Sequence, residues 1–431
     1  MQQLEKPKQG YRFAKWFFGK SIELPENWEL STLGKSCDQI QDMDHKMPTK
    51  QNSGIPFLSI SHVVNKEEID FSNQEYISKE DYAKFLKKMQ PKKNDLLYSR
   101  VGTIGEARII REDKKFAFTY NVVLIKTNEK LNSHFLKYML NFDLIKNRAK
   151  SLAPLGVYSF LGLGDIKKIP ILLPTLQEQQ KIALILSNVD SLIQQTQETI
   201  EQTQRLKKGL MQRLLTKGIG HTKFRKTKVG EIPEGWSILK ANEICNEIVV
   251  GIVIKPASLY SKDGVSCLRS FNIKEEKIYD KDIVKISHKA NEINSKSKLR
   301  KGDVLIVRTG YPGTACVVPQ EYVGGNCIDL VIARPKESLR SKFLSIFINS
   351  SVGKEQVLKT QGGLAQQHFN VSEMKNMLIP LPSLQEQDEI VLILSNVDSQ
   401  IQKHQHYKSK LETLKKGLMQ KLLTGQIRVK V

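Results

Sequence analysis

Two long stretches of the chain carry apolar residues at the three- and four-residue spacing of one helix face. The positions are Ile182, Leu186, Val189 and Ile193 in the first stretch, and Ile390, Leu394, Val397 and Ile401 in the second. The stretches are copies, because residues 176–216 and 384–424 are identical at 26 of 41 positions, without a gap, at an offset of 208. Each copy predicts a long helix whose apolar face needs a partner.

Start and stop signals bound both predicted helices. Each begins with an N-cap residue type, has glutamate three residues later as in a capping box, and ends at a glycine. These positions are Thr175, Glu178 and Gly218 in the first copy, and Ser383, Glu386 and Gly425 in the second. A helix of this length spans ~60 Å and cannot bury its own apolar stripe. We therefore expect the two helices to pack together, antiparallel if a two-fold axis relates the repeats.

The segments before the helices predict an α/β domain in each half. Residues 24–28 match residues 232–236 at the same offset of 208, so the repeat covers whole halves. Expected strands are 55–60, 95–100, 107–111 and 122–126, then a helix from 134 to about 150; in the second half they are 265–268, 303–308, 315–318 and 328–334, with a helix near 342–350. Residues 1–19 are interpreted as an arm or a short added element.

The predicted fold class is therefore α+β, with two α/β domains separated by two long helices in a pseudo-two-fold arrangement. The expected boundaries are a first domain with its arm at 1–170, a helix at 171–219, a second domain at 220–378, and a second helix with a tail at 379–431.

Charge indicates the class of partner. The chain has 67 basic and 45 acidic residues, a formal net charge of +22, which favours nucleic acid first and an anionic membrane second. No apolar run approaches the ~20 residues that cross a bilayer. We expect a soluble, cytoplasmic protein. The five cysteines and eight histidines lack ligand spacing, so no metal, disulfide framework or cofactor is expected.

Motifs of catalysis are incomplete. Gly19-Lys20-Ser21 resembles the end of a P-loop, but Ala14 stands where the first glycine belongs and Pro25 blocks the following helix. Residues 160–164 imitate the glycine turn that binds S-adenosylmethionine, but residues 368–372 of the second copy contain no glycine. We expect no intrinsic methyltransferase, helicase or nuclease activity.

Three duplicated motifs resemble those of the specificity subunits of type I restriction-modification systems, over nearly the entire chain. They are Pro-Glu-x-Trp (25–28, 233–236), Asp-x-Leu-x-x-Arg-x-Gly-x-x-Gly (95–105, 303–313) and the Leu-Pro-x-Leu-Gln-Glu-Gln helix starts. The resemblance implies two target-recognition domains for a split, asymmetric DNA site. It also implies an antiparallel coiled coil that docks two methyltransferase subunits, with restriction subunits joining. An architectural or anti-restriction DNA-binding scaffold is the alternative, and an enzyme in its own right is a third hypothesis.

Comparison of the two halves sorts the candidate DNA-contacting residues. Residues identical in both halves cannot encode two different half-sites, so Arg100 and Arg308 serve either the fold or phosphate contact. Base readout is expected in the divergent segments 39–52, 61–93, 255–262, 269–301 and the loops at Tyr158 and 366–368. The candidates are Arg100, Thr103, Tyr158, Arg269, Arg308, Thr309, Gln366 and Gln367.

The helices carry the candidate docking residues. Glycine inside a helix costs ~1 kcal/mol relative to alanine, so its presence in both copies predicts close approach of a partner subunit or of the opposite helix; a frayed helix end is the plain alternative. The candidates are Gln177, Glu178, Gln179 and Gly209 in the first copy, and Gln385, Glu386, Gln387 and Gly417 in the second.

Overall fold

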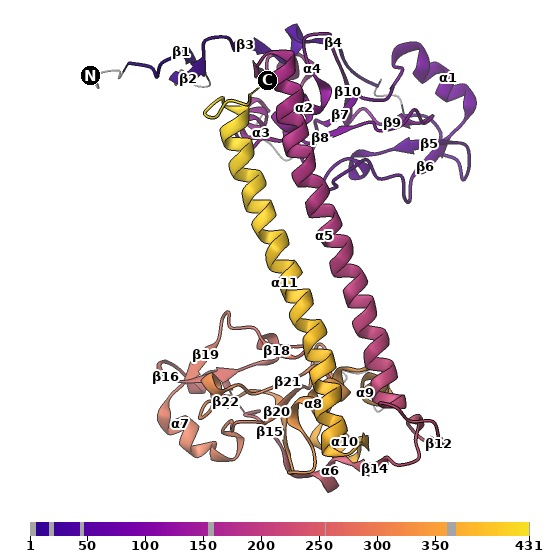
Figure 1. Ribbon diagram of the computed structural model, residues 1–431, viewed down its shortest axis with the longest axis vertical. Coiled ribbons are helices and arrows are strands. Elements are labelled where there is room, and N and C mark those ends of the chain that lie inside the picture. Colours follow the sequence, from indigo (N-terminus) through magenta and orange to yellow (C-terminus); the bar gives the residue numbers. More distant parts are fainter. Residues whose placement is uncertain are drawn as a thin grey trace. The chain divides into compact units, whose positions relative to one another are not determined.

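A computed structural model describes residues 6–16, 21–43, 47–153, 159–254, 256–359 and 368–430. The chain divides into two compact units (Figure 1). Unit 1 comprises residues 1–196 and 406–431, and unit 2 comprises residues 197–405. Each unit therefore contains the start of one long helix and the end of the other.

The two long helices match their predicted bounds. Helix α5 runs over Leu176–Lys217 and α11 over Leu384–Leu423. Both end at a glycine with positive φ, +64° at Gly218 and +73° at Gly425, as the stop signals predict.

In each unit the two helices pack antiparallel, so the expected pairing is confirmed. In unit 1 the start of α5 shares a core with the end of α11, through Ile182, Leu186 and Leu422. In unit 2 the roles are exchanged, and Leu215 of α5 shares a core with Ile390 of α11.

Unit 1 is built on an antiparallel sheet of order β4-β10-β7-β8. Alternation along its strands gives it two apolar faces. Tyr98 and Ile125 belong to the core that includes the helices, whereas Leu97 and Leu124 belong to a second core around Phe57. The strands are β1 Tyr11–Lys15, β2 Ser21–Pro25, β3 Glu29–Thr32, β4 Cys37–Asp42, β5 Ile55–Leu58, β6 Glu75–Ile77, β7 Leu96–Ser99, β8 Ala107–Ile109, β9 Ala117–Phe118, β10 Val122–Thr127 and β11 Pro170–Leu173. The helices are α1 Lys79–Lys88, α2 Ser133–Asn141, α3 Asp143–Leu152 and α4 Leu163–Lys167.

Unit 2 repeats this sheet as β15-β23-β20-β21, also antiparallel. A second sheet, β19-β16-β22, corresponds to β6-β5-β9 of unit 1. The strands are β12 Phe224–Thr227, β13 Gly230–Pro233, β14 Ser237–Lys240, β15 Cys245–Val250, β16 Tyr260–Leu268, β17 Ile273–Lys274, β18 Lys277–Ile278, β19 Val284–Ile286, β20 Val304–Val307, β21 Ala315–Val317, β22 Asn326–Cys327, β23 Leu330–Pro335 and β24 Leu378–Leu381. The shorter helices are α6 Ala241–Ile244, α7 His288–Ile293, α8 Ser341–Asn349, α9 Ser351–Lys359 and α10 Val371–Asn376.

The single helix expected from residue 134 to about 150 is wrong, because two helices occupy this stretch. Phe142 has extended backbone (ψ 130°) between α2 and α3. The preceding Asn141 accepts from the Ala107 amide (3.3 Å) and donates to its carbonyl (2.8 Å), which ties the end of α2 to the edge strand β8. Asn349 binds Ala315 in the same way before the corresponding break in unit 2.

The interpretation of residues 1–19 as an added element is also corrected. Residues 11–15 form β1, which pairs with β2 in a hairpin. Arg12 of this hairpin donates to the Trp28 carbonyl (3.0 Å), as Arg225 of the β12-β13 hairpin donates to that of Trp236 (2.7 Å). The hairpin is therefore part of the repeat, at an offset of 213 (225 − 12) in place of 208.

Candidate nucleic-acid interface

In unit 2 three elements meet at Asp329, which precedes β23. Arg308 follows β20, forms an ion pair with Asp329, and donates to the Asn370 side chain (2.7 Å). The Thr309 hydroxyl donates to the other Asp329 oxygen (3.1 Å) and lies 3.0 Å from Nδ1 of His368. The chain then turns through Gly310 (φ +88°) and Gly313 (φ +78°) into β21, a conformation that glycine adopts without strain.

A groove of about 430 Å³ opens beside this cluster. Its lining residues are Arg269, Ser270, Phe271, Asp282, Ile328 and Asp329. The structure thus gathers three of the predicted contact residues, Arg269, Arg308 and Thr309, around Asp329. Gln366 and Gln367 lie outside the described residues, but His368 directly after them contacts Thr309.

The corresponding part of unit 1 has different chemistry. Arg100 is 4% exposed, and its Nη1 lies 2.6 Å from a carboxylate oxygen of Asp42 in β4. The guanidinium also stacks over Phe160, 5.7 Å from the ring centroid. Burial and neutralisation favour a structural role for Arg100 over phosphate contact. Thr103 is exposed on the turn after β7, and Tyr158 lies outside the described residues.

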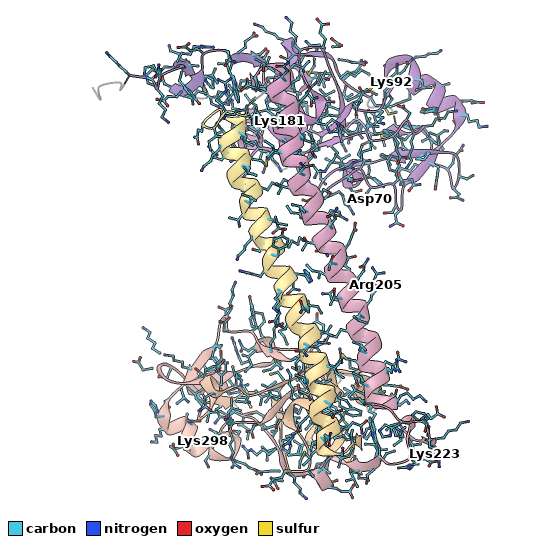
Figure 2. All side chains as sticks on the ribbon, in the orientation of Figure 1. Asp70, Lys92, Lys181, Arg205, Lys223 and Lys298 are labelled. Carbon is cyan, nitrogen blue, oxygen red and sulfur yellow. The ribbon has the colours of Figure 1, made fainter. Side chains whose placement is uncertain are left out.

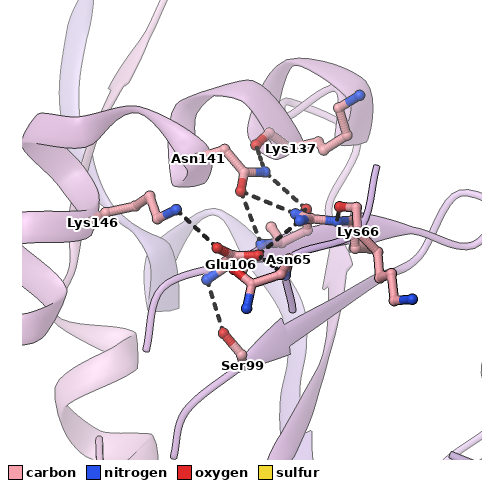
Figure 3. A network of polar contacts seen from close by, with 9 residues as sticks. Asn65, Lys66, Ser99, Glu106, Lys137, Asn141 and Lys146 are labelled. Atoms are coloured by element: carbon pink, nitrogen blue, oxygen red, sulfur yellow. Dashed lines mark hydrogen bonds and ion pairs between the residues drawn. The ribbon is translucent and has the colours of Figure 1, made fainter. Parts of the chain in front are cut away.

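A polar network that sequence reasoning missed joins the sheet of unit 1 to its helices (Figure 3). Glu106 accepts from the Asn65 amide (2.9 Å) and from Arg108 (2.7 Å), and Lys146 of α3 lies 3.3 Å away. Burial raises the pKa of Glu106, but the Asn65 amide and the two cations outweigh it, so the net pKa is lowered. Neither Glu106 nor Arg108 has an identical counterpart 208 residues on, so the repeat gave no signal for them.

Gln179 fixes the start of α5 to unit 1, and Gln387 fixes the start of α11 to unit 2. Both are buried, and each side chain accepts one backbone N–H and donates to two carbonyls. Gln179 bonds Asn132 N (2.8 Å), Lys130 O (3.0 Å) and Pro174 O (2.9 Å); Gln387 bonds Arg340 N (2.8 Å), Ser338 O (3.0 Å) and Pro382 O (3.0 Å). These polar groups are used inside the chain, so the docking assignment of both glutamines stays a prediction.

The predicted capping boxes form by half. Thr175 accepts from the Glu178 amide (3.3 Å), but the Glu178 carboxylate accepts from the indole of Trp28 (3.2 Å) and from Arg428 (2.6 Å). In unit 2 the Glu386 carboxylate accepts from Trp236 (2.9 Å). Donors that are distant in sequence therefore bind these carboxylates in place of the backbone amides of Thr175 and Ser383, which a capping box would use. Gln177 and Gln385, beside these glutamates, are exposed.

The helix glycines Gly209 and Gly417 face open space. A Cβ added at either would meet no described atom within 4 Å beyond its chain neighbours and the adjoining backbone of its own helix. Close approach of the opposite helix, one of the three explanations offered for these glycines, is therefore wrong for this part of the chain. Exposed leucines are duplicated along the same helices, as the pairs Leu176 and Leu384, Leu184 and Leu392, and Leu206 and Leu414.

Exposed basic side chains occur on both units, for example Lys92 and Lys181 in unit 1 and Arg205 and Lys223 in unit 2 (Figure 2). All five cysteines are free thiols. Within the described ranges, no three His, Cys, Asp or Glu side chains are grouped to hold a metal ion. No described helix is both long and apolar enough to span a bilayer.

Comparisons with known proteins agree over nearly the whole chain. Residues 25–202 and 222–413 match the model of the type I restriction modification DNA specificity domain. A putative type I restriction enzyme MjaX specificity subunit of Methanocaldococcus jannaschii is 30% identical over 421 residues, 95% of each chain. The EcoKI specificity subunit of Escherichia coli is 21% identical over 388 residues, 86% of this chain and 82% of its own.

Two solved structures share the fold. A chain from a study of the assembly of a type I R-M system has a TM-score of 0.61 at 18% identity, covering 94% of this chain and 100% of its own. The type I S subunit of M. genitalium has a TM-score of 0.53 at 16% identity, covering 92% and 96%.

Proposed function

Because this chain belongs to the family of type I restriction-modification DNA specificity subunits, we propose that it reads a bipartite, asymmetric DNA target with one unit for each half-site. It is the non-catalytic member of its complex, and methyltransferase and restriction subunits supply the chemistry. In this proposal the domain boundaries are those given above, and the complex works in the cytoplasm.

One observation carries the proposal: the same frame is present twice, with unlike groups at the same place. Arg308 is neutralised beside an open groove by Asp329, whereas Arg100 is buried against Asp42 and Phe160. A protein that read a palindrome would present like surfaces. Two unlike surfaces on like frames fit two different half-sites, about one helical turn or a multiple of it apart.

The duplicated helix surface supports docking of two copies of one partner. Unit 1 presents Leu414 and Gly417, three residues apart on one helix, and unit 2 presents their counterparts Leu206 and Gly209. Exposed leucines beside a glycine that leaves open space are suited to helix packing by another chain. Because this leucine and glycine surface occurs once in each unit, it fits two methyltransferase subunits, one on each unit. Restriction subunits would join the resulting complex.

Co-purification followed by methylation tests the proposal. The tagged chain should capture a methyltransferase, and the complex should methylate one split sequence. Binding should weaken steeply with salt, as phosphate contacts require. Methylation of all sequences alike would contradict the proposal. A chain that binds DNA and captures no methyltransferase would be the architectural or anti-restriction scaffold, and sustained methyl transfer by the chain alone would make it an enzyme.

Exchange of residues 255–301 with those of a relative tests the division of labour. This segment includes Arg269 and the loops that line the groove of unit 2. The exchange should change one half-site and leave the other intact. A change in both halves would contradict readout by separate units.

A further inference from the structure

Arg269 and Ser59 occupy the same position in the two units. Each follows a strand that pairs in parallel with a short strand, since Leu268 pairs with Cys327 and Leu58 with Phe118. Each backbone N–H then donates to the side chain three residues on, Asn272 and His62 respectively, at 3.0 Å. The backbone is thus repeated, and the side chain at this position differs.

The two side chains offer different donors. Arg269 lines the groove, and its Nη2 donates to the carbonyl of Asp282 (2.6 Å). Asp282 has a backbone φ of +54°, and its carbonyl anchors one nitrogen of the guanidinium at the groove. The Ser59 hydroxyl lies 2.8 Å from that of Ser61 and 3.0 Å from the His62 ring, so local groups use it.

The charge of Arg269 is not neutralised by a neighbouring acid. Among the residues that the structure describes, Arg269 forms no ion pair. Asp329, on the same groove, already binds Arg308 and Thr309. The guanidinium of arginine is planar and carries five N–H donors, so Arg269, anchored through Nη2 and without a counter-charge, matches two acceptors on one base edge. The O6 and N7 of guanine in the major groove have this geometry.

We propose that Arg269 reads a guanine in the half-site bound by unit 2, and that unit 1 makes no equivalent contact because Ser59 stands in its place. The inference rests on the proposed function and names the base at one position. A phosphate contact is the competing role for a groove arginine. The two roles differ in geometry, because a phosphate accepts any nearby cation, whereas bidentate recognition of guanine requires the planar fork.

Arg269→Lys separates the two roles, because it keeps the charge and loses the fork. The complex with the co-purifying methyltransferase would be used to select bound sequences from randomised duplexes, and the bound pool would be sequenced. Arg225→Lys is the matched control, since Arg225 also donates to a backbone carbonyl in unit 2 but lies in the β12-β13 hairpin. Thermal unfolding of each variant checks that the fold is kept.

In the expected result the wild-type pool contains a fixed guanine in one half-site. Arg269→Lys should lower the preference for it by about tenfold to a hundredfold and leave the other half-site unchanged. The control should keep the wild-type sequence. Uniformly weaker binding with the same sequence, no change, or a half-site without guanine would overturn the inference. Absence of any defined sequence in the wild-type pool would instead overturn the proposed function.

Discussion

Asp190 holds three helices of unit 1 together, and its removal provides a sharp test of the packing. Its carboxylate oxygens lie 2.5 Å from Lys415 Nζ of α11, 2.7 Å from the Tyr138 hydroxyl of α2 and 3.4 Å from Lys137 Nζ. In the described part of the chain, the counterpart in unit 2, Asp398, has one charged partner, Lys207 at 2.6 Å. The aspartate at this position of the repeat therefore binds two other helices in unit 1 and forms a simple ion pair in unit 2.

Asp190→Asn should cost more stability than Asp398→Asn. The Asp190 side chain is 22% exposed, and asparagine would leave Lys137 and Lys415 facing each other without a counter-charge. Loss of a hydrogen-bonded charge of this kind costs about 1.5–3 kcal/mol. The Asp398 side chain is 30% exposed and bonds one lysine, so its loss should cost about 0.2–1 kcal/mol.

The difference should disappear in acid. Burial raises the pKa of Asp190, but Lys415, Lys137 and Tyr138 outweigh it and lower the net pKa below the ordinary value of 3.8. An acid whose pKa is lowered on folding stabilises the folded state above its unfolded pKa, and that stabilisation is lost as pH falls through the folded pKa. Wild type and Asp190→Asn should therefore differ fully at pH 7, begin to converge as the pH falls below about 4, and converge further as it falls through the lower folded pKa.

Urea unfolding followed by tryptophan fluorescence measures these differences. Trp236→Phe in all variants leaves Trp16 and Trp28, both of unit 1, as the reporters. At an m-value of about 2 kcal/mol/M, a loss of 2 kcal/mol lowers the midpoint by roughly 1 M. For Asp398→Asn the complementary background Trp16→Phe/Trp28→Phe leaves Trp236 as the reporter and places the signal in unit 2. Equal losses for the two aspartates, or an undiminished loss at pH 3, would refute the reasoning.

Three further predictions concern the helix ends and the helix glycines. Gly425→Ala should cost more than about 2 kcal/mol of unfolding free energy, because Gly425 has a positive φ and the added Cβ would lie 2.7 Å from Pro25. Gly220→Ala is the control: Gly220 also has a positive φ, +73°, but faces open space, so its loss should cost about 1 kcal/mol, and urea midpoints compare the two. Arg428→Ala should lower stability by about 1.5 kcal/mol, because Arg428 donates to Oε1 of buried Glu178, whereas Trp28 and Thr175 donate to Oε2. His221→Ala should cost less, because the Ile219 amide still donates to the same Oε1 of Glu386; equal urea midpoints would contradict this. Gly209→Ala and Gly417→Ala should raise helix stability by up to ~1 kcal/mol yet reduce capture of the methyltransferase in pull-downs, with Gly164→Ala as a control in open space; unchanged capture would reject docking at these glycines.

The sequence predicted the frame of each unit because the frame depends on local patterns. Periodicity and end signals placed α5 and α11 closely, and apolar runs placed β7 and β20 within one residue at each end. Short strands with two residues, such as β9 and β22, carry no period that a sequence can reveal. They exist because β5 and β16 offer a free edge to pair with.

The misses have a common physical cause, which is competition from groups distant in sequence. Glu178 does not complete the capping box, because its carboxylate accepts a hydrogen bond from the buried indole of Trp28, 150 residues away in the sequence. The helix expected over 134–150 broke because Asn141 binds the edge of β8. Of the candidate site, comparison of the halves predicted the groove residue Arg269, but the Asp329 side chain that organises the groove carries no motif of its own.

The ion pairs of Arg100 and Arg308, each with an acid of its own unit, show how one frame can carry two different surfaces. Both arginines stand at the same place in the repeat, and both are neutralised, but by acids from different elements. Asp42 in β4 corresponds to Val250, and Asp329 corresponds to Asn121, so the acid has changed position while the pairing has been kept. A phosphate-binding arginine would need its charge free, whereas a structural arginine requires a counter-charge from any side. Unit 1 has its acid in β4, at Asp42, whereas unit 2 has it at the groove, at Asp329. This difference leaves the frame intact and changes the polarity of the groove, so one unit can differ from the other without a change of fold.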